Sequence, residues 1–248
     1  MQRSQKILIG VGTGVLAVTV VAATIGPIVY RDFIAPPAAH APTLGSNSDL
    51  LGEAPQSPDS TDAMSPSGAP LDAAALAGAW TIGSGSEAGY RVDEVLNGAG
   101  VTVTGRTPDV SGTLTINPTG TALEAAALTV DVASIETGSS SRDAYFRDRA
   151  LRADEYPTAT FVLTSPVAFG ELPASGATAE AQATGDLTIA GVTHSVTADV
   201  SVRSDGKTAQ IAGTIPVAFA DFGVDAPSLG FVKVEPTGYV EFQLTATR

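Results

Sequence analysis

The chain has 248 residues, with 13 Lys and Arg against 26 Asp and Glu, so its formal net charge is −13 at pH 7. This charge excludes a broad nucleic-acid interface, because phosphates require a basic surface, and it disfavours electrostatic docking on anionic lipid. Cysteine is absent, which excludes disulfides, thiol catalysis, thiolate metal sites and a lipid-modified cysteine. The two histidines, His40 and His194, are too few for a histidine-based metal cluster within one chain. We therefore expect no metal and no cofactor.

The N-terminal region has the pattern of a membrane anchor. Arg3 and Lys6 precede an uncharged, largely apolar stretch at residues 7–30, and about 20 apolar residues cross a bilayer core as a helix. Since the apolar region of a cleaved signal peptide is shorter, roughly 7–15 residues, we predict an uncleaved signal anchor within residues 1–34. The preceding positive charges place the N-terminal stub in the cytoplasm and the rest outside. The alternative is a cleaved signal peptide, which would leave a secreted protein.

Two further features concern the dimerisation of the anchor and the linker that follows it. Gly10 and Gly14 form a Gly-x-x-x-Gly pair, which would let two transmembrane helices approach as a weak homodimer, or which reflects only a chain rich in small residues. Residues 35–77 are rich in proline and alanine, carry only acidic charges and show no periodicity. We expect them to form a disordered, extended linker, with His40 solvated within it.

From residue 78 onward the sequence indicates antiparallel β-structure. Strict alternation runs from Val192 to Val202, with His194 on the apolar face, and a side-chain period of two is typical of a half-buried strand. Gly191 suits a turn before this run, and Asp205-Gly206 suits a hairpin after it. Many short strands separated by turn signals indicate a sandwich or a closed barrel. The expected strands are residues 90–96, 101–106, 112–116, 123–133, 158–165, 184–189, 192–203, 208–219 and 239–247.

One segment, residues 139–152, departs from the β-pattern and is expected to form a short helix. Asp143 with Arg147, and Asp148 with Arg152, have the i,i+4 spacing of ion pairs. One interpretation is a cationic rim at a barrel mouth, facing the polar head of an amphiphile. The other is a salt-bridged helix that covers one end of the barrel, and the ion-pair spacing favours this second interpretation.

Six short motifs, in this order, resemble the YceI-like, polyisoprenoid-binding family of bacterial envelope proteins. They are Gly78-Ala79-Trp80-Thr81-Ile82, Ala133-Ser134-Ile135-Glu136-Thr137-Gly138, Arg142-Asp143, Tyr156-Pro157-Thr158-Ala159-Thr160-Phe161, Gly185-Asp186-Leu187-Thr188-Ile189-Ala190-Gly191-Val192-Thr193 and Asp221-Phe222-Gly223. The resemblance implies that residues 78–248 form a lipocalin-like, antiparallel, eight-stranded barrel with an elongated apolar cavity. It also implies a non-catalytic binder of isoprenoid or other lipid chains. Many family members have a histidine shortly after the Arg-Asp pair, where this chain has Tyr145-Phe146.

No catalytic constellation accompanies these motifs. A lone histidine needs a second orienting group to act as a base, so a structural or rim role is expected for His194. No paired carboxylates at a spacing typical of acid–base catalysis are present. We therefore do not expect an enzyme.

Eight strands enclose an interior that is either packed with side chains or holds one small ligand. Because Ala, Thr, Val and Gly are frequent where a filled core would have Leu and Ile, we expect room for a ligand. Taken with the apolar N-terminal stretch, the family resemblance implies a protein of the bacterial cell membrane, single-pass and tethered, whose extracytoplasmic barrel holds a long-chain isoprenoid, quinone or related lipid. The alternative is a filled barrel that serves as an envelope interaction or stress-response module without a ligand. The candidate cavity or rim residues are Trp80, Tyr90, Tyr145, Phe146, Phe161, Phe169, Phe219, Phe231, Phe242, Arg142, Arg147 and His194.

Overall fold

The computed structural model describes residues 37–45 and residues 70–248 except 97, 229 and 231. The expected anchor at residues 7–30, with its Gly10 and Gly14 pair, lies outside the described residues. Within the described ranges, no helix is both long and apolar enough to cross a membrane.

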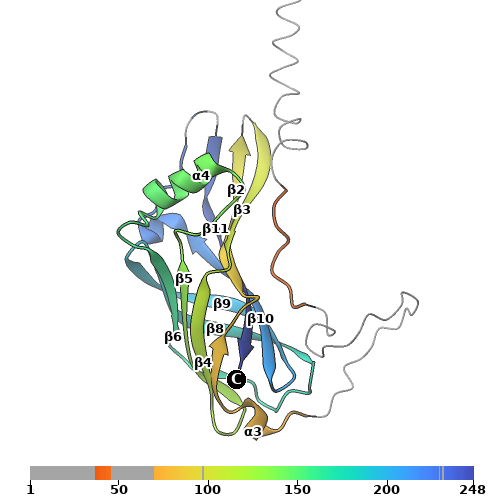
Figure 1. The fold of residues 1–248 in the computed structure, drawn as a ribbon. Helices are drawn as coiled ribbons and strands as arrows, with labels where there is room; N and C mark the ends of the chain where they lie inside the picture. The colour runs from red at the N-terminus through yellow and green to blue at the C-terminus, as the bar shows by residue number, and fades with distance from the viewer. Residues whose placement is uncertain (1–36, 46–69, 97, 229, 231) are drawn as a thin grey trace, which may run out of the picture.

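Most of the described chain forms one antiparallel β-sheet (Figure 1). The strands are β1 (Gly78–Ile82), β2 (Glu87–Leu96), β3 (Ala99–Thr107), β4 (Val110–Ile116), β5 (Ala122–Asp131), β6 (Thr158–Leu163), β7 (Val167–Ala168), β8 (Thr178–Ile189), β9 (Val192–Ser204), β10 (Thr208–Ala218) and β11 (Val232–Thr247). The helical elements are α3 (Ala73–Leu76), α4 (Ser140–Tyr145), the π-helix η2 (Phe146–Ala150) and the 3-10 helix η3 (Phe219–Phe222).

Eight of these strands close into a ring in the order β1, β4, β5, β6, β8, β9, β10 and β11. The ring closes where β1 pairs with β11, with Thr81 opposite Thr247 and Ile82 opposite Ala246. The expected eight-stranded antiparallel barrel is therefore confirmed. Strands β2 and β3 extend the sheet from β11 beyond the ring, toward the end of the molecule that carries α4 (Figure 1). We call this end the upper end and the end at α3 the lower end.

The upper section, which contains β2 and β3, exists because two long strands bend. β1 and β2 are two parts of one bent strand, and β3 and β4 are parts of another, since β1 pairs with β4 and β2 with β3. The first bend is fixed by Ser86, whose hydroxyl donates to the carbonyl of Gly83 at 2.7 Å and accepts from the Thr245 N–H at 3.0 Å. The second bend contains Pro108, which has no N–H to donate to a neighbouring strand.

Alternation along the strands places small residues inside the barrel. In β8, Ala183 and Leu187 are buried while Glu180 and Gln182 are exposed, which is the expected period of two. Several strands extend further than the sequence predicted. β8, for example, begins at Thr178. Its first part contains alanines, which have low intrinsic β-propensity, but pairing with β9 holds them in the sheet.

Both ends of the barrel are covered by helical segments. At the lower end, α3 is capped by the Asp72 carboxylate, and the Trp80 indole N–H donates to the carbonyl of Leu76 at 2.8 Å. At the upper end, α4 and η2 lie across the barrel (Figure 1), in agreement with the helix expected at residues 139–152.

The ion pairs of this helix differ from the expected i,i+4 pairs. Among the described residues, Arg147 pairs with its neighbour Asp148 and Arg152 with Glu155. Arg142 instead reaches Glu94 on β2. The π-turn at η2 changes the spacing of side chains along the helix, so residues four apart no longer face each other.

The expected linker, residues 35–77, is ordered in two described parts. Residues 37–45 form hydrogen bonds to the outer wall of the barrel. At the other end of the segment, Pro70 bridges Ala174, and the Leu71 N–H donates to the Pro173 carbonyl at 2.9 Å. Leu71 and Leu76 therefore pack against the lower core of the barrel.

Leu244 on β11 tests the packing of the closed ring, since it is only 2% exposed and belongs to the lower core cluster. We expect Leu244→Ala to lower the free energy of unfolding by about 2–5 kcal/mol in urea titrations. Val162→Ala is the control, because Val162 is 48% exposed, and it should change stability by about 0.5 kcal/mol or less. Equal effects of the two substitutions would contradict the described packing.

Candidate functional site

The lower half of the barrel encloses an apolar cavity of about 430 Å³. Small side chains from neighbouring strands, such as Ala126, Ala181 and Ala198, line it and leave the space open. Charged side chains, Glu171 and Arg203, are few in the lining. Most of its large side chains are aromatic or aliphatic, among them Trp80, Leu114, Phe161, Phe169, Phe242 and Leu244. Such a surface can contact a hydrocarbon chain along its whole length.

A second cavity of about 510 Å³ occupies the upper section. It is lined by apolar groups, and in addition by the charged residues Glu94, Arg142 and Asp225. The two cavities share a set of lining residues at the waist of the barrel, so they adjoin there. The shared residues are Ala88, Val130, Ala159, Ile189 and Val240.

Two of the charged groups of the upper cavity, Glu94 and Arg142, form an ion pair. Glu94 has the same strand parity as Tyr90 and Val92, so its carboxylate points inward, and it is only 6% exposed. The guanidinium of Arg142 on α4 donates to it at 3.0 Å. A buried charge is stable only when it is paired, so each group holds the other at the cavity wall.

Tyr90 forms the contact between the barrel and the helix above it. Its ring stacks on Phe146 with centroids 4.6 Å apart and an interplanar angle of 19°. Gly105 on β3 leaves room for this ring, since a Cβ there would lie 2.5 Å from it. Burial raises the pKa of the Tyr90 hydroxyl well above its usual range, and the nearby Arg142 guanidinium opposes only part of this rise. The phenol therefore stays neutral at physiological pH.

The start of α4 is held by its own side chains and by β3. The Asp143 carboxylate accepts from the N–H of Thr137 at 2.9 Å and from its hydroxyl at 2.6 Å. One residue earlier, Glu136 exchanges two backbone hydrogen bonds of 3.0 Å with Arg106. These contacts fix where the helix enters the cavity roof, and with it the position of Arg142.

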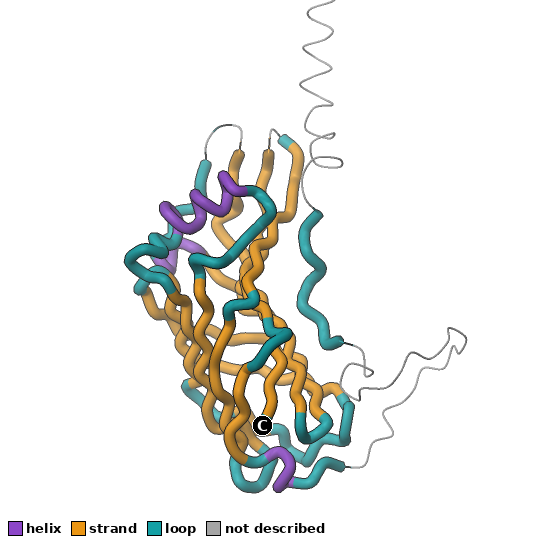
Figure 2. The backbone as a smooth tube through the Cα atoms, viewed as in Figure 1, coloured by secondary structure: helices purple, strands orange, loops and turns teal. Residues whose placement is uncertain are grey.

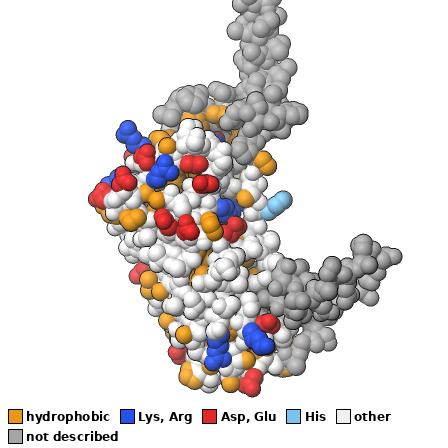
Figure 3. Space-filling model, in the orientation of Figure 1, with side chains coloured by type: hydrophobic (Ala, Val, Ile, Leu, Met, Phe, Trp, Pro, Cys, Tyr) orange, Lys and Arg blue, Asp and Glu red, His pale blue; other side chains and the backbone are white. Residues whose placement is uncertain are grey.

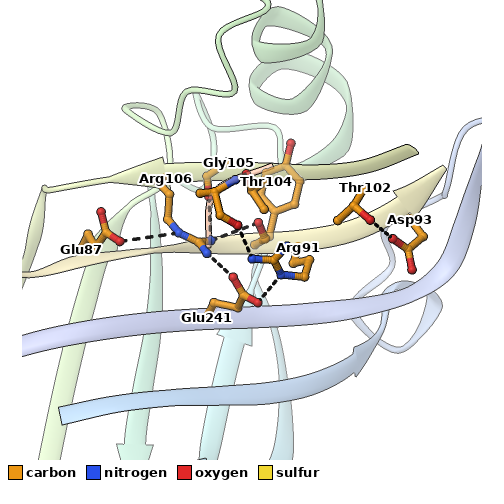
Figure 4. A network of polar contacts seen from close by, with 10 residues as sticks. Glu87, Arg91, Asp93, Thr102, Thr104, Gly105, Arg106 and Glu241 are labelled. Carbon is orange, nitrogen blue, oxygen red and sulfur yellow. Dashed lines mark hydrogen bonds and ion pairs between the residues drawn. The ribbon is translucent and has the colours of Figure 1, made fainter. Parts of the chain in front are cut away.

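A second charge cluster lies on the outer face of the same strands (Figure 4). Glu241 on β11 is only 2% exposed, and its carboxylate accepts from Arg91 Nε at 2.6 Å and from Arg106 Nη2. Gly89 is opposite both Glu241 and Arg106 in the sheet, so no side chain blocks Arg106 from crossing to β11. Arg106 also donates to the Tyr90 carbonyl at 3.2 Å. The cluster therefore ties β2, β3 and β11 together behind the upper cavity.

Comparison with known proteins identifies the fold. The YceI-like domain profile matches residues 80–246. The chain belongs to the YceI-like domain family. Protein YceI of Shigella flexneri and of Escherichia coli O157:H7 are each 32% identical to it over 99 residues, covering 40% of this chain and 48% of theirs. The match thus spans about half the length of these curated relatives.

One solved structure has the same architecture. The polyisoprenoid binding domain from Saccharophagus degradans, described as implicated in plant cell wall breakdown, superposes with a TM-score of 0.53 at 19% identity, covering 68% of this chain and 97% of that one. BcnA of Burkholderia cenocepacia is 27% identical with a TM-score of 0.49, covering 64% and 96% of the two chains. The first of these similarities shows the fold of the YceI-like domain.

Most of the candidate residues line one of the two cavities. Trp80, Phe161, Phe169 and Phe242 line the lower one. Tyr90, Arg142, Tyr145, Phe146 and Phe219 line the upper one. Phe231 lies outside the described residues.

Arg147 and His194 are not among the described residues that line either cavity of this YceI-like domain. The reason for His194 is the local sheet geometry. β9 pairs with β10 only from Asp199 to Ser204, so its first part is paired in the sheet with β8 alone. There His194 is exposed and its ring meets the edge of Phe222, with centroids 5.3 Å apart.

Two important residues, Glu94 and Glu241, were missed by sequence reasoning, and the sequence held a signal for only the first. Glu94 is a charged residue at an inward position of a predicted strand, which calls for a buried partner. Glu241 is on the polar side of its strand, so nothing in the sequence distinguishes it from a solvated carboxylate.

Among the described residues, no group of three or more His, Asp or Glu side chains is arranged to hold a metal ion.

The raised pKa of the Tyr90 hydroxyl allows its burial in the upper cavity to be tested by a pH titration. The folded domain keeps a proton that the unfolded chain releases near its ordinary pKa of about 10, so this contribution to stability is complete below that pH and is lost as the pH rises above it. In an ultraviolet titration, Tyr90→Phe should remove the tyrosine that ionises last. Tyr239→Phe is the control, because Tyr239 is exposed. Loss of an ordinary tyrosine titration in Tyr90→Phe would contradict the buried phenol.

Proposed function

We propose that this YceI-like domain is a carrier that holds one long-chain isoprenoid, quinone or related lipid in its barrel, tethered by residues 7–30 to the outer side of a bacterial cell membrane. The observation that carries the proposal is the pair of adjoining cavities with apolar linings, about 430 and 510 Å³ in volume. Ligand pockets usually measure about 300–1,000 Å³. The description of the Saccharophagus degradans domain as polyisoprenoid-binding supports the same ligand class.

Burial of hydrocarbon supplies the affinity. Each CH₂ group removed from water contributes about 0.8 kcal/mol, so a long chain binds tightly without polar contacts. The lower cavity suits the tail, since its walls are almost wholly apolar side chains. The same space argues against the alternative of a filled barrel that acts only as an interaction module. Such a role needs no open interior.

The upper cavity suits a polar but uncharged head group. It offers hydrogen-bond donors from Tyr90, Ser139, Ser141 and Arg142. Arg142 is already neutralised by Glu94 at 3.0 Å, so a phosphate placed beside it would also meet a buried carboxylate. Like charges in a desolvated site are strongly disfavoured. We therefore favour a carbonyl-bearing head, such as a quinone, over a prenyl phosphate.

A bulky residue in the lower cavity should shorten the chain that the barrel accepts. Ala181 lines that cavity, whereas the next residue, Gln182, is exposed on the outer face. We expect Ala181→Trp to weaken binding of long-chain quinones by about tenfold for every two CH₂ groups displaced, while short-chain quinones bind as before. Gln182→Trp is the matched control. The measurement is fluorescence or calorimetric titration with quinones of increasing chain length, and equal losses at all lengths would contradict the tail assignment.

Removal of the buried carboxylate should change head-group preference. Glu94→Gln leaves the Arg142 guanidinium without its anionic partner, so binding of a prenyl phosphate should strengthen by about tenfold relative to a quinone of equal chain length. Asp93→Asn is the control, because Asp93 is on the same strand but pairs with Thr102 on the outer face. An unchanged ratio of the two affinities in Glu94→Gln would show that the head group lies elsewhere.

A further inference from the structure

Residues 37–45 are bound to the outer wall of the barrel, and we call them the strap (Figure 2). The Ala39 N–H donates to Thr104 Oγ1 at 2.8 Å, and the Ala39 carbonyl accepts from Arg91 Nη2 at 2.7 Å. At the other end of the strap, the Gly45 carbonyl accepts from Arg203 Nη2. Between these points Pro42 and Leu44 are half-buried. The strap therefore contacts the wall along its length.

The wall has a fixed site for the strap. The side chain of Arg91 is held by Glu241, which binds Nε (Figure 4). Nη2 of Arg91 donates to the Ala39 carbonyl. A free arginine side chain has about 2 kcal/mol of rotamer entropy, and much of this is already lost through the Glu241 contact. The outer charge cluster, which has no contact with the cavity interior, thus presents an ordered donor to a peptide carbonyl.

The direction of the strap is set by these contacts. Arg91 is flanked by Tyr90 and Val92, both of which line the upper cavity. Arg203 is beside Ser204, at the hairpin whose Gly206 lies against Ala75 of α3. The strap therefore runs from the level of the upper cavity toward the lower end, with its N-terminal end uppermost (Figure 2).

The short length of chain between the proposed membrane span and the strap limits how the barrel can be oriented on the membrane. An extended chain spans at most about 3.6 Å per residue, so residue 37 lies within about 25 Å of residue 30, where the proposed membrane span ends. A chain free from residue 30 to residue 70 could reach about 140 Å. We infer that the strap holds the barrel with its upper end against the bilayer surface. This inference rests on the membrane tether of the proposed function.

The side chains at the upper end fit a lipid surface. Tyr145 on α4 lines the upper cavity and is nevertheless exposed, and Val95 is exposed near the end of β2. Tyrosine is enriched at membrane–water interfaces, where its ring meets lipid and its hydroxyl meets water. Acidic and basic side chains are mixed over the face that carries α4 (Figure 3), so the contact needs no anionic lipid. A lipid tail could then pass between bilayer and cavity without crossing bulk water.

The experiment uses the full chain in phosphatidylcholine vesicles that contain a nitroxide-labelled lipid as quencher. Because the chain has no cysteine, single fluorophores can be placed through Tyr145→Cys at the upper end and Ala74→Cys at the lower end. We expect several-fold stronger quenching of the label at position 145. Equal quenching at the two positions would overturn the orientation.

Two insertions then test the strap itself. A flexible Gly/Ser insertion of about 20 residues, with a mean reach of about 25 Å, is placed between residues 36 and 37 in one variant and between residues 57 and 58 in the other. The first lengthens the chain before the strap and should lower quenching at position 145 several-fold. The second lies after the strap and should leave it unchanged. Equal effects of the two insertions would overturn the inference.

Flotation of the vesicles separates this inference from the proposed ligand. If the full chain does not float with vesicles, the tether is wrong and the orientation falls with it. Quinone binding by residues 37–248 in solution is measured independently and does not depend on that result.

Discussion

The pairing of β11 with three neighbours is the constraint on which the rest of the structure depends. Its C-terminal part pairs with β1 and β10 and closes the ring, while its first part pairs with β2 and carries the upper section. Closure removes the exposed strand edges of the ring. It also fixes which side chains face inward, since alternate residues of each strand point to opposite faces. Because many of these are alanine, the interior remains open.

The charged residues of the upper section separate onto its two faces. Glu94 and Arg142 are paired on the inner face, where they border the space for a head group. Glu241 joins Arg91 and Arg106 on the outer face. The upper section lies beyond the closed ring, so these ion pairs and the Tyr90–Phe146 stack supply order that strand closure does not. The same outer cluster also binds the strap, so one group of ion pairs both stabilises the wall of the upper cavity and holds the strap.

Local sequence pattern accounts for much of this fold. The period of two after Gly191 led to an expected strand at residues 192–203, within one residue of the observed end of β9, and the family resemblance carried by the ordered motifs implied the eight-stranded barrel. Pattern did not reveal the first part of β8, because Ala179, Ala181 and Ala183 have low β-propensity and are held in the sheet by β9. The order within residues 37–45 was also missed, since it depends on partners that are distant in sequence.

The site was predictable in kind but not in detail. Aromatic residues on separate strands indicated a lined interior, and the aromatic candidates among the described residues do line it. Alternation alone placed His194 inward, but where β9 leaves β10 the parity of a residue no longer decides which surface it meets. The partner of Arg142 could not be deduced from spacing along the helix, because a π-turn and a contact with another strand determine it.

The most direct measurement is native mass spectrometry of residues 37–248 as purified from bacterial cells, followed by organic extraction of anything bound. The account predicts a mass increase from one bound lipid, and an extract that contains a long isoprenoid or related chain with an uncharged head. A protein that is empty as purified, and that also takes up neither added quinones nor polyprenols, would contradict the account and leave the barrel as an interaction module.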